Sequence, residues 1–369
     1  MPRLRSLASD AGCSAQDRAR ISPASSASPP GSFRPSVIRA SLFPVAAWLL
    51  AAAAHASVNA ASVSPCSGSH PMTDAWFTGP MLANTAATAP RGHYLFEPYL
   101  YDVSTQGVYD STGKRRSTTR QNSYGSLSYL IYGLTDRIGL GIIPTAGYNT
   151  IAGAPSSSGP GTGDLSILLQ RGITQFQPCR QIPAVSFAVE QTLPTGQFDR
   201  LGNRSANGFG AGAYTTMPAI YSQMYFWMPN RRIVRTRLDV SDAFSRAVAV
   251  QDASVYGTTT GFRGTARPGR SLYIDNAWEY SVTRSWVLAL DATFRNTGNT
   301  RVVGSYPSPA GSVTNTVTNS GWSDAWGLAP AVEYSWKPWI GVLVGVRTIP
   351  AGRNTTESIT PAVAVNIVH

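Results

Sequence analysis

The chain has 369 residues, of which 13% are charged and 43% hydrophobic, and it carries a formal net charge of +11. Only Lys114 and Lys337 of its 30 basic residues are lysines, and no basic run exceeds three residues, so we exclude nucleic acid as a partner. No run of about twenty apolar residues follows residue 56, which excludes a membrane-spanning helix beyond that point.

The first 56 residues divide into two parts. Residues 1–36 are rich in Ser, Pro and Arg and have no hydrophobic periodicity, so we interpret them as a non-native or disordered extension. In residues 37–56, an arginine precedes the apolar run 42–54, and Ala54-His55-Ala56 supplies the small residues of a cleavage site. These three features predict a secretory signal peptide, and therefore export to the bacterial cell outer membrane.

Residues 57–92 are predicted to be an N-terminal periplasmic segment that contains Cys66. Cys13 is lost with the signal peptide, which leaves Cys66 and Cys179 as the remaining cysteines. Both lie in segments that we place in the periplasm, where oxidising conditions favour disulfides. We therefore predict a Cys66–Cys179 disulfide, with two unpaired thiols as the alternative.

Residues 93–369 are predicted to form a transmembrane antiparallel up-and-down β-barrel of about twelve strands. The alternation is clear in the segment 271–282, where Trp278 and Tyr280 fall on one face and Glu279 on the other. A helix would distribute the apolar residues around its whole circumference, so a period of two favours strands. The predicted strands are 93–105, 121–135, 138–151, 163–176, 183–196, 211–229, 233–250, 270–284, 286–303, 324–337, 339–351 and 358–369.

The connections between these strands alternate in length. The short turns are 135–137, 229–232, 283–285 and 337–338. The long connections, rich in Gly, Ser, Asn and Pro, are 107–120, 152–162, 197–211, 251–270 and 305–323. Short periplasmic turns alternating with long external loops are typical of outer-membrane barrels, and large aromatic residues on the apolar face favour lipid outside and a polar interior.

Charged residues within the predicted strands would be costly if they faced lipid, so we expect their side chains to face the lumen. Two interpretations remain open. These side chains line a pore and bias which solutes pass, or opposite charges form a network that fills the barrel and makes it rigid. The candidate lumen-lining residues are Glu97, Glu190, Arg235, Arg237, Asp239, Asp275, Glu279, Asp291, Arg295, Glu333 and Arg347.

Several short motifs point to one family. Gly161-Thr162-Gly163-Asp164-Leu165 opens one strand, and the next strand, which begins near Ile182-Pro183-Ala184, ends in Leu193-Pro194-Thr195-Gly196. With Tyr132-Gly133-Leu134-Thr135-Asp136, these motifs resemble the outer-membrane "transporter" family associated with the meta-cleavage pathway of phenol degradation. The resemblance runs from about residue 75 to the end of the chain. It implies a barrel with a transport role, for substrates that are poorly defined.

The sequence offers no recognisable catalytic set. The histidines that remain after the signal peptide are His70, His93 and His369, and His93 lacks the Ser two residues later that a barrel phospholipase carries. The His and Cys residues have no metal-ligand spacing, and the glycine-rich run 159–163 lacks the Lys-Ser/Thr of a phosphate loop. We therefore predict no enzymatic activity, no metal site and no cofactor.

The function that we expect is an outer-membrane channel that gives passive passage to small solutes, with aromatic or hydrophobic compounds as the class to consider first. The first alternative is a structural or adhesive barrel that acts through its external loops. A barrel enzyme and a secreted soluble β-sandwich are less favoured. The expected partners are outer-membrane lipid and lipopolysaccharide, the barrel-assembly machinery and a small-molecule solute.

Overall fold

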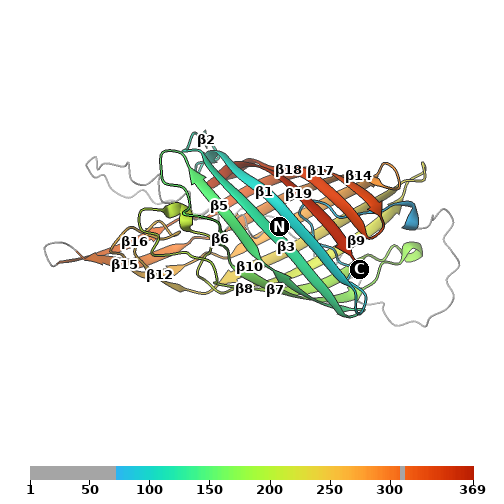
Figure 1. Cartoon of the computed structure of the whole chain (residues 1–369), viewed down its shortest axis with the longest axis horizontal. Coiled ribbons are helices and arrows are strands. Elements are labelled where there is room, and N and C mark those ends of the chain that lie inside the picture. Colours follow the sequence, from blue (N-terminus) through green and yellow to red (C-terminus); the bar gives the residue numbers. More distant parts are fainter. Residues whose placement is uncertain (1–71, 308–311) are drawn as a thin grey trace, which may run out of the picture.

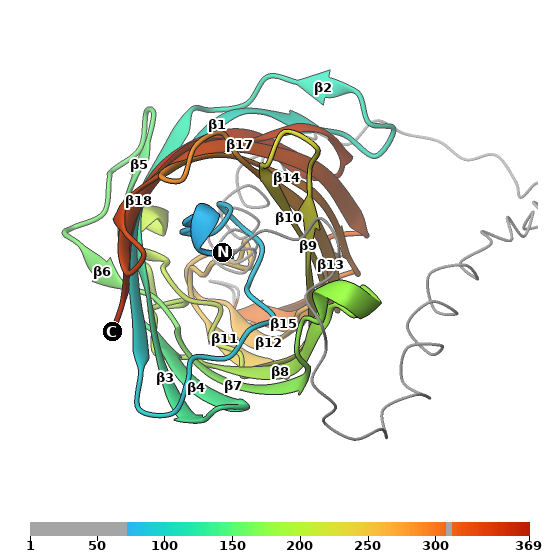
Figure 2. The same ribbon diagram turned by 90° about the vertical axis from the view of Figure 1, so that its right-hand side faces the viewer.

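The computed structural model describes residues 72–307 and 312–369. In this part of the chain, twelve antiparallel strands form one closed barrel, which confirms the predicted fold (Figures 1 and 2). The closing strand is β1 (Tyr94–Tyr109), which pairs with β19 (Thr355–Val368) on one side and with β3 (Gln121–Thr135) on the other. A closed sheet presents no unpaired edge to lipid, where backbone groups would have no other partner.

Each of the other wall strands pairs with the wall strands that precede and follow it in the chain. They are β4 (Ile138–Ile143) with β5 (Thr145–Ile151), β7 (Leu165–Thr174), β8 (Ala184–Leu193), β9 (Thr215–Trp227), β10 (Ile233–Ser245), β13 (Ser271–Ser281), β14 (Trp286–Thr297), β17 (Ser323–Lys337) and β18 (Ile340–Arg353). The predicted strand 138–151 is divided into β4 and β5, both paired with β3, because Pro144 between them has no N–H to donate to the ladder.

Side chains alternate between the interior and the lipid-facing surface along the wall strands. In β13, Asp275 and Glu279 are buried while Trp278 is exposed on the outer surface. Outward-facing aromatic rings form contacts between strands near both ends of the barrel, Trp286 with Tyr334 at the turn end and Phe294 with Trp326 at the loop end. Paired belts of this kind mark the two membrane interfaces of outer-membrane barrels.

The two ends of the barrel differ. Short periplasmic turns close one end, and the long external loops lie at the other, as predicted. Two of these loops, however, are not irregular as the sequence suggested, and they begin earlier than predicted, because residues 248–250 and 301–303 were assigned to the wall strands 233–250 and 286–303. They contribute β11 (Val248–Gln251), β12 (Arg263–Arg267), β15 (Arg301–Pro307) and β16 (Val313–Asn319) to a separate four-stranded sheet, the external sheet. Its strands are short and its partners β12 and β15 come from different loops, so local periodicity does not reveal it.

The remaining regular pieces are short: β2 (Arg115–Arg116), β6 (Gly161–Thr162) and the 3₁₀ turns η1 (Met72–Asp74), η2 (Pro178–Arg180) and η3 (Ser205–Asn207). None of the helical turns in the described residues is long and apolar enough to cross a membrane.

Candidate functional site: the barrel lumen

An irregular segment of the chain occupies the lumen. Residues 75–88, here called the plug, run inside the ring of strands ahead of β1 (Figure 2, blue). Residues 57–92 are predicted from the sequence to be a periplasmic segment, but residues 75–88 of this range lie within the barrel. The side chains of Met81, Leu82 and Ala86 are at most 3% exposed. No charged residue lies between Asp74 and Arg91, which suits a segment enclosed by protein.

Three carboxylates on the inner wall accept the backbone N–H groups of the plug. Glu333 on β17 accepts from Thr78 N at 2.7 Å and Gly79 N at 3.1 Å, both through Oε2. Asp291 on β14 accepts from the three amides of residues 81–83 at 3.0–3.2 Å. Asp239 on β10 accepts from the amide of residue 84 at 2.6 Å.

The interruption in this series is Pro80, which has no N–H to satisfy. Irregular backbone in an enclosed space needs partners for its polar groups. The wall carboxylates supply them, so the plug and the acidic residues of the lumen form one unit.

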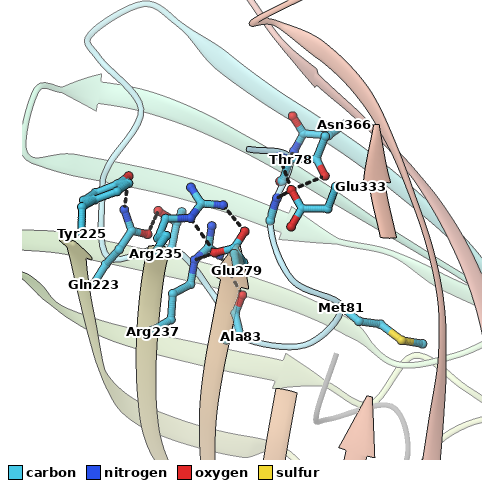
Figure 3. Close-up of polar contacts among 12 residues, drawn as sticks. Thr78, Met81, Ala83, Gln223, Tyr225, Arg235, Arg237, Glu279, Glu333 and Asn366 are labelled. Atoms are coloured by element: carbon cyan, nitrogen blue, oxygen red, sulfur yellow. Dashed lines mark hydrogen bonds and ion pairs between the residues drawn. The ribbon is translucent and has the colours of Figure 1, made fainter. Parts of the chain in front are cut away.

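A buried charge cluster lies beside the plug on β10 and β13 (Figure 3). Arg235 binds Glu279 through Nε and Nη2, and Arg237 Nε lies 3.5 Å from Glu279 Oε2. Both guanidinium groups also contact the plug. Arg237 Nη1 donates to Ala83 O at 2.9 Å, and Arg235 lies 4.4 Å from the centre of the Phe77 ring. A buried ion pair contributes little net stability, but removing one partner is costly, so this cluster fixes the geometry of the lumen.

Side-chain amides complete the attachment of the plug. Gln170 on β7 donates to Thr85 O at 2.8 Å, and Asn366 on β19 donates to Thr78 O at 3.2 Å. Where the chain leaves the lumen, Asp136 in the turn between β3 and β4 accepts from Arg91 N at 3.0 Å. The plug is thus attached to strands on opposite sides of the barrel.

All eleven predicted lumen-lining residues lie on the inward side of their strands. Every one apart from Glu97 and Arg295 is buried. Glu97 accepts the Tyr99 hydroxyl at 3.0 Å, and Arg295 lies 5.0 Å from the centre of the Tyr273 ring. The structure brings Arg235, Arg237, Glu279, Asp239, Asp291 and Glu333 together around the plug.

Asp239 and Asp275 face each other directly across β10 and β13. The Tyr273 hydroxyl donates to one oxygen of Asp275 at 3.0 Å. The other oxygen of Asp275 and Oδ1 of Asp239 are buried and have no hydrogen-bond partner among the described residues. These two oxygens are therefore enclosed by protein on the inner face of the wall.

A cavity of about 190 Å³ lies between the end of the plug and the periplasmic ends of β7, β8 and β9. Its wall is mainly apolar and includes Ala86, Ile173 and two rings, Phe176 and Tyr225. The Phe176 ring centre lies 5.0 Å from that of Tyr225 and 5.9 Å from that of Trp227. The polar groups of Gln223 and Thr88 also reach it, which gives a small aromatic-lined space at the periplasmic mouth.

The external loops pack over the other end of the barrel. Asp164, within the motif that precedes β7, accepts Gly196 N at 2.9 Å and Ala211 N at 2.8 Å, and so connects three loop segments. Burial raises the pKa of Asp164 in spite of these hydrogen bonds. The Phe209 ring lies directly against Gly161, where an added Cβ would come within 2.2 Å of it. The glycine-rich motifs therefore allow close packing of loops.

Several sequence predictions concern the histidines and cysteines. Cys179 is disulfide-bonded and lies in η2 at the periplasmic end. Cys66, the extension 1–36 and the signal peptide 37–56 lie outside the described residues, so the Cys66–Cys179 pairing stays a prediction. His369 stacks on Tyr94 at the barrel seam, with ring centres 5.3 Å apart. Within the described ranges, no three His, Cys, Asp or Glu side chains are grouped as metal ligands.

Comparison with known proteins supports the fold and no closer relationship. No family model and no curated protein sequence matches the chain. Among solved structures, an outer membrane channel from Pseudomonas putida F1 is similar with a TM-score of 0.57 at 15% identity, over 78% of this chain and 100% of that one.

Two other solved structures match with lower scores. The NanC porin matches at TM-score 0.40 and 11% identity, over 74% of this chain and 98% of its own. The TodX ΔS2S3 mutant monoaromatic hydrocarbon channel matches at TM-score 0.35 and 12% identity, over 76% and 91%. The chain thus has the barrel fold seen in an outer-membrane channel.

Proposed function

We propose that the protein is an outer-membrane channel that gives passive passage to small solutes, and that the plug controls this passage. The observation that carries the proposal is the closed barrel whose lumen is filled by the chain's own irregular segment. A wall that needed only a solid core would be filled by its own inward side chains. Here, wall carboxylates instead accept the backbone N–H groups of a segment that is not part of the strand ladder, so release of this segment breaks no hydrogen bond between wall strands.

Opening requires the plug to exchange its wall partners for water. Water that enters the lumen can replace hydrogen bonds to amides and carboxylates, and this limits the cost of plug release. The wall that remains carries both signs of charge, with acidic groups in the majority among the eleven lumen residues. An opened lumen of this composition favours small polar or amphipathic solutes over fatty molecules.

Aromatic compounds are the solute class that we would test first. The cavity at the periplasmic mouth is lined by Phe176 and Tyr225 and has room for about one small ring. Aromatic side chains bind aromatic solutes by offset or edge contacts. The Thr88 hydroxyl, which donates to Asp136 O, keeps its acceptor lone pairs for a hydroxyl substituent of the solute. The resemblance to a transporter family of phenol degradation points to the same class.

The test is single-channel conductance of the refolded mature protein in planar bilayers. Folding is verified beforehand by heat-modifiable migration on gels. The wild type is compared with a variant that lacks the plug, residues 75–88, because this deletion removes the backbone N–H groups that the wall carboxylates bind and leaves the wall strands intact. We expect rare or small openings in the wild type and larger, more frequent steps in the variant. Block by aromatic acids then tests the solute class.

Asp242→Asn is the control for a nonspecific effect, because it removes a carboxylate that pairs with exposed Arg270 outside the lumen. It should conduct as the wild type does. Two folded barrels that both fail to conduct would refute the channel. Equal, large conductance in wild type and plug variant would retain the channel but refute control by the plug.

The external sheet supports a second candidate, a barrel that acts through its loops. This alternative predicts that shortening the strands of the external sheet abolishes binding to a surface or partner while conductance is unchanged. The channel proposal predicts the reverse dependence, on the plug and not on the sheet.

A further inference from the structure

The external sheet has two different faces. Side chains of Val250, Phe262, Ala266 and Val302 are buried on the face that packs against other loops. Residues between them in β12 and β15 point to the opposite face, because side chains alternate along a strand. This outer face carries three exposed arginines, Arg263, Arg267 and Arg301.

The three arginines form an uncompensated positive patch. Arg267 stands directly opposite Arg301 across the antiparallel pair β12 and β15, and Arg263 lies on the same face of β12. Like charges directly opposite each other destabilise a sheet unless a counter-charge is present. The four strands contain no Asp or Glu. In the described part of the chain, these three side chains form no ion pair or side-chain hydrogen bond.

Three other arginines at the same end of the barrel have carboxylate partners. Arg115 pairs with Glu357, Arg116 with Asp110 and Arg270 with Asp242. The loop end therefore has carboxylates available where an arginine is to be neutralised by the protein itself. The patch on the outer face of the sheet is left for an anion from outside.

The position of the sheet indicates which anion it meets. At the loop end of the barrel, Phe244 and the Phe294–Trp326 pair face outward and mark the external membrane interface. The Arg270 guanidinium lies 5.1 Å from the centre of the Phe244 ring. Arg267 precedes Arg270 by three residues and is the last residue of β12 in the external sheet. The sheet extends beyond the wall at this end (Figure 1).

We propose that Arg263, Arg267 and Arg301 bind phosphate groups of the inner core of lipopolysaccharide, the anionic lipid of the outer leaflet. Guanidinium groups bind phosphate oxygens in bidentate geometry, and two opposed arginines offer two such forks to one polyanionic headgroup. Val303 and Val317 are paired between them and are 42% and 54% exposed, which provides an apolar surface for sugar rings or acyl chains. This contact is independent of conduction through the lumen.

The test measures binding of purified rough lipopolysaccharide to the full mature protein in detergent. The variant is Arg263→Gln/Arg267→Gln/Arg301→Gln, which keeps polar side chains on the face and alters no lumen residue. We expect its affinity to fall by about tenfold or more, given the typical contribution of each basic residue at an anionic lipid surface. The wild-type affinity should also fall with rising salt and after enzymatic dephosphorylation of the lipid.

The matched control is Arg231→Gln/Arg232→Gln in the turn between β9 and β10, at the opposite end of the barrel. It should bind lipopolysaccharide as the wild type does. Unchanged affinity in the triple variant, or an equal loss in the control, would overturn the proposal. Competition by inorganic phosphate at concentrations comparable to the lipid would also overturn it, because it would identify a site for free anions.

Discussion

The wall carboxylates that hold the plug differ in how many of their oxygens they use. Asp291 accepts through both oxygens, Oδ2 from Met81 and Oδ1 from Leu82 and Ala83. Glu333 accepts through Oε2 alone, while its Oε1 has no hydrogen-bond partner in the described residues. Replacing a carboxylate by an amide leaves one acceptor oxygen and introduces one NH₂ donor group. This replacement therefore has different consequences at Asp291 and at Glu333.

We predict that Asp291→Asn releases the plug more than Glu333→Gln does. The asparagine side chain must turn its NH₂ group toward one of the plug's N–H donors, at a cost of about 1.5–3 kcal/mol for a lost charge-assisted bond. The glutamine side chain keeps its single acceptor position. Hydrogen exchange of the peptide that contains residues 78–84 should therefore be about tenfold faster or more in Asp291→Asn. Asp242→Asn should leave this exchange unchanged, and equal exchange in the two lumen variants would contradict the prediction.

Asp164 gives the external loops a pH dependence of defined sign. Burial raises its pKa above the ordinary value of 3.8, so the folded loops bind the proton more tightly than the unfolded chain does. Its contribution to loop stability is fully present below the unfolded pKa and is lost as pH rises through the folded pKa. Amide exchange at Gly196 and Ala211, corrected for intrinsic rates, should accelerate across this range in the wild type. Asp164→Asn should remove the dependence; an identical pH profile in that variant would contradict the assignment.

Among the elements, the external sheet has a small core of its own. The Phe262 ring lies over the Gly264–Gly304 pair, where an added Cβ on either glycine would come within 2.6 Å of it. It also makes an edge contact with Tyr306, with ring centres 5.2 Å apart. The sheet is therefore a folded unit with its own apolar cluster, separate from the wall.

Phe262→Ala should unfold the sheet locally without opening the barrel. Loss of a buried phenylalanine costs about 3–5 kcal/mol, which is more than so small a cluster can supply. Limited trypsin digestion should then cut after Arg263, because Pro268 prevents cleavage after Arg267, while heat-modifiable migration of the barrel is retained. Val303→Ala, on the exposed face of the same sheet, should remain resistant. A protease-resistant Phe262→Ala variant would show that the sheet does not depend on this cluster.

At the scale of the whole molecule, the disulfide connects the periplasmic turn to the rest of the chain. Cys179 is disulfide-bonded in η2, between β7 and β8. We predict that Cys66 is the partner, which would tie the segment ahead of the plug to the barrel's periplasmic rim. Peptide mapping of the mature protein without reduction should recover a linked Cys66–Cys179 pair that separates on reduction. Two free thiols would contradict the prediction.

The pattern of residues along the chain is sufficient to predict the barrel. A period of two along each strand, alternating connection lengths and scarce charge together specify a closed sheet with apolar residues outside. The same alternation places Glu279, Asp291 and Glu333 on the inward face, because a charge facing lipid would be too costly. These are local properties, since each strand's two faces can be identified from its own residues.

The contents of the lumen and the external sheet depend on contacts between segments that are far apart in the chain. The plug has no secondary-structure period, so its position depends on partners more than 150 residues away, such as Asp239, Asp291 and Glu333. Its lack of charge between Asp74 and Arg91 was the one signal of enclosure in the sequence. The external sheet likewise pairs strands from two different loops. Contacts of this kind become favourable only after the barrel has brought the segments together, because loop closure costs entropy first.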